Sequence, residues 1–181
     1  MQLKAIKLFI VFFYSISSFA QISPIHTATL PNSLNEVSGM GLFNDTLYMH
    51  NDGGNPAEIY GIDSLGKLIS THTFSNTSNT DWEAFQISKQ GDFLVADIGN
   101  NSNNRTDLRF YLARHFNPKT ATPISADTIG FTYITQSSFP PSNAERHFDA
   151  EGFIVVKDSI FIFTKNRSNP YNGYSYVHYL P

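Results

Sequence analysis

Short runs of alternating apolar and polar residues recur along most of the chain, and helical periodicity is nearly absent. The runs are rich in aromatic and β-branched residues and are bounded by Asn, Asp, Gly, Ser and Pro, a pattern typical of β-strands joined by turns. We therefore predict an all-β fold. The expected strands are TLYMH (46–50), EIYGI (58–62), DFLVADI (92–98), DLRFYL (107–112), TIGFTYI (128–134), GFIVV (152–156) and SIFIFT (159–164).

The strands belong to a longer unit that occurs three times, at 35–55, 80–101 and 148–169. Each unit runs from a glutamate into an apolar strand, a polar turn, a second apolar strand and an Asn-rich loop. Self-similarity of this length with four short strands per unit predicts the blades of a β-propeller. An unrelated β-sandwich is the alternative. Third and fourth strands are expected at 58–63 and 67–74, then at 107–114 and 127–134.

Two full units and about half of a third do not close a ring, because propellers have four blades or more. The chain ends at SYVHYLP (175–181), where we expect the third strand of the third unit. A lone strand near 24–30 would complete the last blade of a closed ring. We therefore predict that 21–181 form a partial β-propeller of about two and a half four-stranded blades, a fragment whose remaining blades lie downstream.

The first 20 residues have the pattern of a secretory signal peptide. Lys4 and Lys7 precede an apolar run, LFIVFF (8–13), and a segment that ends in the small residues Ser18 and Ala20. The apolar run is shorter than the roughly 20 residues that span a bilayer, so no membrane span is expected after removal of the signal. An N-terminal membrane anchor or a buried strand is the alternative. The pattern favours a secreted, periplasmic or cell-surface protein.

Charge and cysteine content narrow the possible partners. Removal of Lys4 and Lys7 with the signal leaves 10 basic and 15 acidic residues, without a basic cluster. This composition gives no electrostatic footprint for nucleic acid. The chain has no cysteine, so disulfides and thiolate metal sites are excluded, and export without disulfides favours a bacterial envelope protein.

Glutamates open the three units, at Glu36, Glu83 and Glu151. Because the first strand of each propeller blade lines the central channel, we expect these side chains to converge on one channel mouth. Asp81 and Asp149 lie two residues earlier, on the same side of the pleat. The alternative is that such acids accept N–H groups of the loops and fix the turns between blades. Trp82, beside Glu83, points to the opposite face and is expected to pack between blades.

Folding each unit into a hairpin places further acids across from these residues. Glu36 is then opposite Asp52, and Glu83 is opposite Asp97, with side chains about 5 Å apart. Like charges at this distance require a cation, a protonated carboxyl or capping N–H groups. In the third unit Lys165 takes the opposite position and can pair with Glu151. Oxygen-only ligands favour Ca²⁺ or another hard cation.

Six short motifs stand out: E-x-S-G (36–39), H-N-D-G-G-N (50–55), D-W-E-A (81–84), D-I-G-N-N (97–101), N-R-T-D-L (104–108) and D-A-E-G (149–152). Together they resemble the motifs of an uncharacterised group of secreted bacterial β-propeller proteins, which is similar to phytase-like and gluconolactonase/regucalcin-like six-bladed propellers. The resemblance covers about 35–169 and implies a propeller with a metal ion in its channel. In gluconolactonase-like propellers a glutamate at the start of the first blade binds a divalent metal, a position that Glu36 matches.

The sequence thus predicts a binding or interaction module whose channel mouth holds a hard divalent cation. Its partner would be a small molecule or a protein. One alternative is a metal-dependent hydrolase of the lactonase or phosphoesterase type in the full-length protein, in which metal-bound water or a channel acid performs the chemistry. Another is a protein-interaction platform that binds no metal.

Overall fold

The computed structural model describes residues 23, 25–26, 28–119 and 123–181. The predicted signal peptide, 1–20, lies outside the described residues. So do residues 24 and 27 of the strand expected near 24–30, and the remaining residues of that segment are not in a strand. No helix within the described ranges has the length and apolar character needed to cross a membrane.

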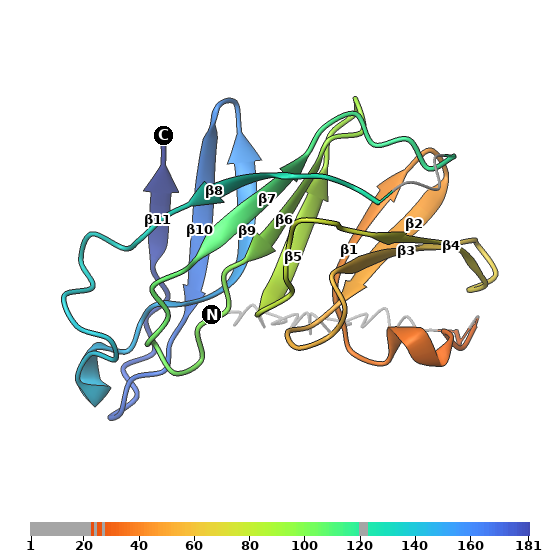
Figure 1. Ribbon diagram of the computed structural model, residues 1–181. Coiled ribbons are helices and arrows are strands. Elements are labelled where there is room, and N and C mark those ends of the chain that lie inside the picture. The colour runs from red at the N-terminus through yellow and green to blue at the C-terminus, as the bar shows by residue number, and fades with distance from the viewer. Residues whose placement is uncertain (1–22, 24, 27, 120–122) are drawn as a thin grey trace, which may run out of the picture.

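The described residues form three antiparallel sheets with almost no helix, so the all-β prediction is confirmed (Figure 1). The first sheet contains β1 (Val37–Phe43), β2 (Thr46–Asn51), β3 (Glu58–Ile62) and β4 (Leu68–Thr73). The second contains β5 (Trp82–Ile87), β6 (Phe93–Asp97), β7 (Arg109–Ala113) and β8 (Asp127–Gly130). The third contains β9 (Asp149–Val156), β10 (Ser159–Lys165) and β11 (Val177–Leu180). Two short 3₁₀ helices, η1 (Asn32–Leu34) and η2 (Asn143–Glu145), precede the first and third sheets.

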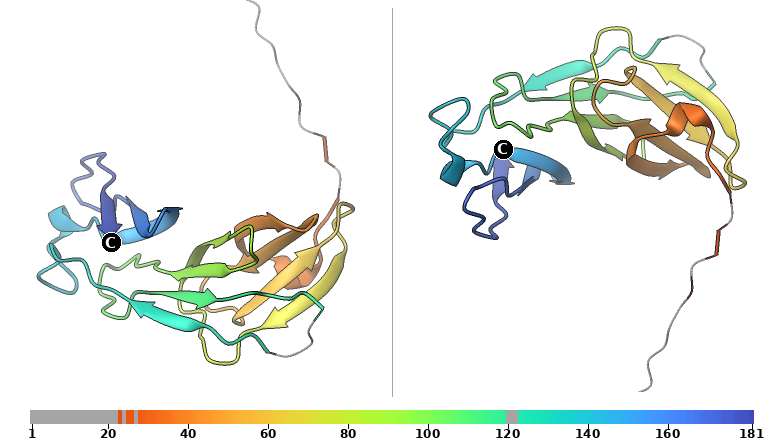
Figure 2. Two further views of the ribbon diagram at one scale, coloured as in Figure 1. Left: turned by 90° about the horizontal axis from the view of Figure 1, so that it is seen from above. Right: turned by 90° about the horizontal axis from the view of Figure 1, so that it is seen from below.

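Neighbouring strands in each sheet are also neighbours in the sequence, as in a blade of a propeller. The sheets follow one another in chain order through the molecule, and they do not close into a ring within the described residues (Figures 1 and 2). Their first strands lie together, because β1 contacts β5 and β5 contacts β9. The tight β1–β2 turn is formed by Asn44 and Asp45, both with positive φ, as a two-residue hairpin of this kind requires.

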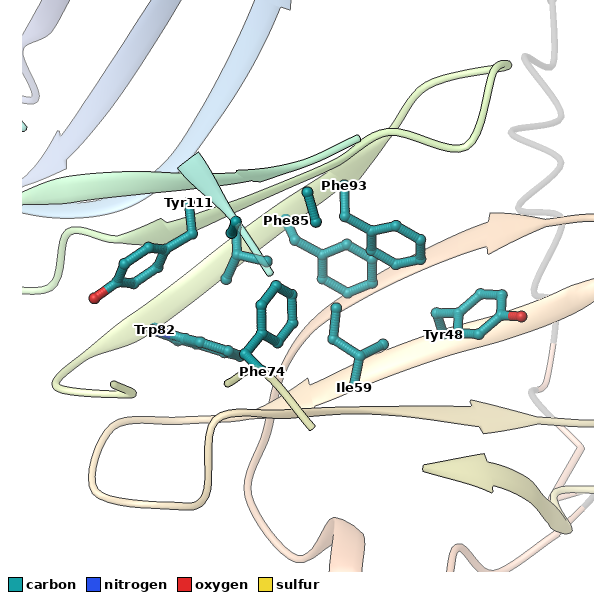
Figure 3. Packing of buried hydrophobic residues seen from close by; sticks show 10 residues of the cluster. Tyr48, Ile59, Phe74, Trp82, Phe85, Phe93 and Tyr111 are labelled. Carbon is teal, nitrogen blue, oxygen red and sulfur yellow. The ribbon is translucent and has the colours of Figure 1, made fainter. Parts of the chain in front are cut away.

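Apolar side chains fill the space between successive sheets. Trp82 is completely buried between the first and second sheets, and its Nε1 donates a hydrogen bond to the carbonyl of Ser78 at 2.9 Å (Figure 3). The expectation that Trp82 packs between the repeated units is therefore confirmed. This core consists of Tyr48, Ile59, Phe74, Trp82, Phe85, Phe93, Val95, Tyr111, Ala113 and Ala126.

Two further clusters cover the other faces. The second and third sheets share a core that includes Ala96, Phe110, Phe153 and Ile162. The outer face of the first sheet is covered in part by the N-terminal segment, whose Leu34 is buried against this face. Most of the apolar positions of the first two sheets are thus buried on both faces.

A β-bulge interrupts the first strand pair of every sheet at the same position. The unpaired residues are Ser38, Glu83 and Glu151. The bulge resets the alternation of the pleat, which places Trp82 and Phe85 on the same face although they are three residues apart.

The bulges correct two predicted registers. Asp97 pairs with Trp82 rather than with Glu83, and Lys165 pairs with Asp149 rather than with Glu151. They also show that Ser38, not Glu36, occupies the position of Glu83 and Glu151. Glu36 instead corresponds to Asp81 and Asp149.

Candidate functional site

Five of the seven predicted acids lie together near one end of the first strands. We call Asp52, Asp81, Glu83, Asp149 and Glu151 the acidic cluster. Carboxylate oxygens of Asp52, Asp81 and Glu83 lie within 4.8 Å of one another, and the same holds for Glu83, Asp149 and Glu151. Glu83 belongs to both groups because its position on the β5 bulge lies between the first and third sheets.

The other two predicted acids lie elsewhere. Glu36 is exposed, and its Oε2 accepts a hydrogen bond from the Asn55 side-chain amide at 2.8 Å. Its backbone carbonyl does accept the Asp52 N–H at 2.8 Å, so the predicted pairing of these two residues holds for the backbone. Asp97 is fully buried and accepts the Asp81 N–H at 2.9 Å.

Asp97 is neutralised by two arginines that sequence reasoning missed. Its Oδ1 lies 3.0 Å from Nη2 of Arg105, and its Oδ2 lies 3.4 Å from Nε of Arg109. Burial raises the pKa of Asp97, while the two guanidinium groups act in the opposite direction. The R-x-D-x-R spacing of 105–109 is the sequence signal that could have indicated this network, because alternate residues in extended chain share a side.

The half of the cluster on the third sheet has its own cations. Nζ of Lys165 lies 2.9 Å from Oε1 of Glu151, which confirms the predicted ion pair. Nε of Arg167 lies 2.6 Å from Oδ2 of Asp149, and the backbone N–H of Asn100 donates to Oδ1 of Asp149 at 2.8 Å. The carboxylates of Asp149 and Glu151 are therefore compensated within the chain.

The half formed by Asp52, Asp81 and Glu83 lacks such compensation: no ion pair within the described ranges includes any of the three. Burial, reinforced by Asp52 and other neighbouring acids, raises the pKa of Asp81 to about 6, although Arg105 opposes this change. Burial and the charges of the surrounding acids, Glu151 first among them, raise the pKa of Glu83 to about 8. Ionisation of Asp81 and Glu83 is thus unfavourable in the chain without a bound cation.

Two glycines allow the carboxyl groups to approach the backbone closely. A Cβ atom at Gly99 would collide with the carboxyl groups of Asp81 and Glu83, and one at Gly53 would lie 2.7 Å from Oδ1 of Asp81. The glycines come from the two Gly-Asn loops that follow β2 and β6. Their role is therefore to make room for the acidic cluster, in addition to shaping the loops.

Buried asparagines fix the second sheet to the start of the third. Asn103, whose φ is 54°, accepts the Phe148 N–H through its side chain at 2.8 Å and donates to the carbonyl of Asn100 at 3.0 Å. The side-chain amide of Asn100 donates to the Phe148 carbonyl at 3.2 Å. These contacts hold Asp149 at its place beside Glu83.

Comparison of the chain with protein-family models and with curated proteins gives no match in either case. Among solved structures, the computationally designed Ika4 protein is similar over 88% of this chain and 100% of its own, with 9% sequence identity and a TM-score of 0.40. A similarity at this level supports neither a family nor a function.

Proposed function

We propose that the three sheets are consecutive blades of a partial β-propeller in which β1, β5 and β9 line the channel. The proposal is supported by the sequential strand order, the contacts between first strands and the bulge that recurs in each sheet. The third sheet has three strands where the others have four, and its outer face exposes Ile154, Phe163 and Val177. In a propeller a neighbouring blade would cover such a face.

We further propose that the mouth of the channel binds a hard divalent cation, Ca²⁺, through Asp52, Asp81 and Glu83. The observation that carries this proposal is the group of three uncompensated carboxylates within 4.8 Å of one another. Carboxylate oxygens are the ligands that Ca²⁺ prefers, and the glycines beside them leave room for the carboxyl groups. Lys165 and Arg167 supply positive charge to the other half of the cluster.

A bound cation would join two sheets, since Asp52 directly follows β2 of the first sheet, while Asp81 directly precedes β5 of the second and Glu83 lies in β5. Its charge would offset the repulsion among the carboxylates and hold Asp81 and Glu83 in their ionised forms. We propose that the exported protein uses this stabilised mouth as a binding module for a small molecule or a protein.

The rival function is a metal-dependent hydrolase of the lactonase or phosphoesterase type. One observation favours it: if Asp52 and Asp81 hold the metal ion and Glu83 does not, the Glu83 carboxyl group, whose pKa is raised to about 8, can act as a general acid near neutral pH. Hydrolysis of lactone or phosphoester substrates that requires Glu83 would favour this function over the binding module.

The metal proposal is tested by calcium titration of the mature chain, followed by thermal unfolding. A ligand at 100 times its dissociation constant stabilises the folded state by about 2.7 kcal/mol. For a chain of this size we expect Tm to rise by about 5–10 °C. The variant Asp81→Asn should lose the rise, and the control Asp158→Asn, which changes an exposed acid at the β9–β10 turn, should keep it. The absence of a rise in the unmodified chain, or an equal rise in Asp81→Asn, would overturn the proposal.

A further inference from the structure

A second concave site lies between the β8–β9 connection and the start of β11, with a volume of about 440 Å³. It shares no residue with the acidic cluster. Its volume is within the range of pockets that bind small ligands. Residues from both segments line it, among them Gln136, Glu145, His147, Phe148, Tyr176 and His178.

Aromatic rings form much of its wall. The ring of Tyr176 lies 4.8 Å from that of His147 at an angle of 41°. The ring of His178, also in the wall, packs 4.4 Å from that of Tyr133, which does not itself line the pocket. Tyr176 is 42% exposed, so part of its side chain is open to a ligand. Flat apolar faces of this kind favour a ligand that itself has a flat apolar face.

Polar atoms without a partner are concentrated at the same wall. Gln136 is 6% exposed, and its Nε2 donates to the Asn103 carbonyl at 2.8 Å, whereas its Oε1 has no hydrogen-bond partner. Nε2 of His178, which also lines the pocket, is likewise buried without a partner. A buried polar group without a hydrogen-bond partner costs about 1–3 kcal/mol. A ligand that supplies hydrogen bonds to these atoms would therefore be favoured.

The charges around the pocket restrict the class of ligand. Glu145 is the one acidic residue among the described residues that line it, and no lysine or arginine lines it, so an anion is disfavoured. Burial lowers the pKa of His178, which keeps that ring neutral at pH 7. A purely apolar ligand would leave Gln136 unsatisfied.

We propose that this pocket binds a neutral saccharide of one or two sugar units. The C–H face of a sugar ring packs against Tyr176, and its hydroxyl groups pair with Gln136 Oε1, His178 Nε2 and the Glu145 carboxylate. Gln136 Oε1 and His178 Nε2 are shielded from water in the free chain. Binding therefore includes rotation of these two side chains, a common adjustment on complex formation. The site is independent of the proposed calcium site.

Ligand-observed NMR and calorimetry of the mature chain test the proposal. The probes are glucose, galactose, mannose, N-acetylglucosamine and their β-1,4-linked disaccharides, with choline and inorganic phosphate as the other arms. We expect saturable binding of at least one sugar at millimolar or lower concentration, unchanged by a calcium chelator. Binding of choline or phosphate alone, or of none of the probes, overturns the proposal.

Two variants locate the binding. Tyr176→Ala removes the exposed ring, and His178→Phe keeps the ring but removes its nitrogen atoms. We expect each to weaken the binding of the sugar about tenfold, the effect of losing one good contact. Tyr171→Ala is the matched control, because Tyr171 is 75% exposed and lies outside the pocket. Thermal unfolding verifies that each variant is folded, and equal affinity in all four chains would overturn the assignment of the site.

Discussion

The substitution Glu83→Gln removes one charge from the uncompensated half of the acidic cluster and retains the size of the side chain. Glu83 is half-buried on the β5 bulge, within 4.8 Å of acids from the first and third sheets. If its ionisation opposes folding, the glutamine variant should be the more stable protein wherever the wild-type carboxyl is ionised and no cation is bound.

The loss of stability caused by ionisation of Glu83 follows from its pKa values in the unfolded and folded chain. In the unfolded chain Glu83 ionises near its ordinary pKa of 4.5, whereas in the folded chain its pKa is about 8. The contribution of protonated Glu83 to the free energy of unfolding is therefore fully present below pH 4.5, and it is lost as the pH rises toward 8. Each pH unit in this window costs about 1.4 kcal/mol before screening is considered. Partial exposure and salt reduce the total, and we expect a loss of about 1–2 kcal/mol, or roughly 3–6 °C in Tm.

Thermal unfolding in the presence of a chelator at pH 5 and pH 8 measures the difference. At pH 5 the two proteins should have similar Tm values, and at pH 8 Glu83→Gln should unfold at the higher temperature. Added calcium should reverse the order, because only the wild type retains all three carboxylates. Asp158→Asn is the control: Asp158 is an exposed acid at the β9–β10 turn and does not belong to the acidic cluster, so its removal should not stabilise the chain at pH 8. Equal stability of wild type and Glu83→Gln at pH 8, or an equal gain in Asp158→Asn, would refute the reasoning.

Three further changes test the surroundings of the cluster. In Gly99→Ala the added methyl group meets the carboxyl groups of Asp81 and Glu83, so we expect loss of the calcium-dependent rise in Tm and about 1–3 kcal/mol lower stability in urea; an intact calcium response would contradict this. Asp97→Asn removes the buried carboxylate that Arg105 and Arg109 share and leaves them paired with the more exposed Asp107. It should lower the free energy of unfolding in urea by about 3–5 kcal/mol, and a loss below 1 kcal/mol would argue against that network. Lys165→Met removes the nearest cation from Glu151, so calorimetry should show tighter calcium binding, and weaker binding would count against the charge balance described above.

Alternation of apolar and polar residues was sufficient to predict most of the strands. β3, β4 and β10 lie within or close to the expected ranges, because each is a clear apolar run between strong turn signals. The expected strand at 128–134 is shorter in the structure, where β8 ends at Gly130. Phe131 and Tyr133 continue the apolar pattern, but they pack in the loop against Leu108 and Phe148 rather than in the sheet. An apolar pattern shows that residues are buried, not which structure buries them.

The bulges could not be read from an assumed period of two. In a regular strand Trp82 and Phe85 would face opposite sides of the sheet. They share one core because the bulge inserts a residue between them. Aligning the repeats by their glutamates therefore placed Glu36 two residues out of step with Glu83 and Glu151. Aligning them by the paired residues that precede each bulge, Val37, Trp82 and Ala150, gives the structural correspondence.

The sequence predicted that the acids lie close together, but it did not predict all of the cations that pair with them. The sequence identified the repeated acids and the Glu151–Lys165 pair, because both depend on residues one hairpin apart. Arg105 and Arg167 reach Asp97 and Asp149 from loops, whose conformations are fixed by buried asparagines such as Asn103. Such contacts depend on tertiary structure and leave only a weak pattern in the sequence.

The residue at each bulge is free of two constraints that govern its neighbours. It has no partner in the strand ladder, and Ser38, Glu83 and Glu151 all lie outside the buried cores. Mutation at this position can change the charge of the mouth while the framework of the sheet stays intact. Duplicated units could therefore diverge in their chemistry through one residue per repeat, and in this chain they already hold a hydroxyl, an uncompensated carboxyl and a lysine-paired carboxylate on a common scaffold.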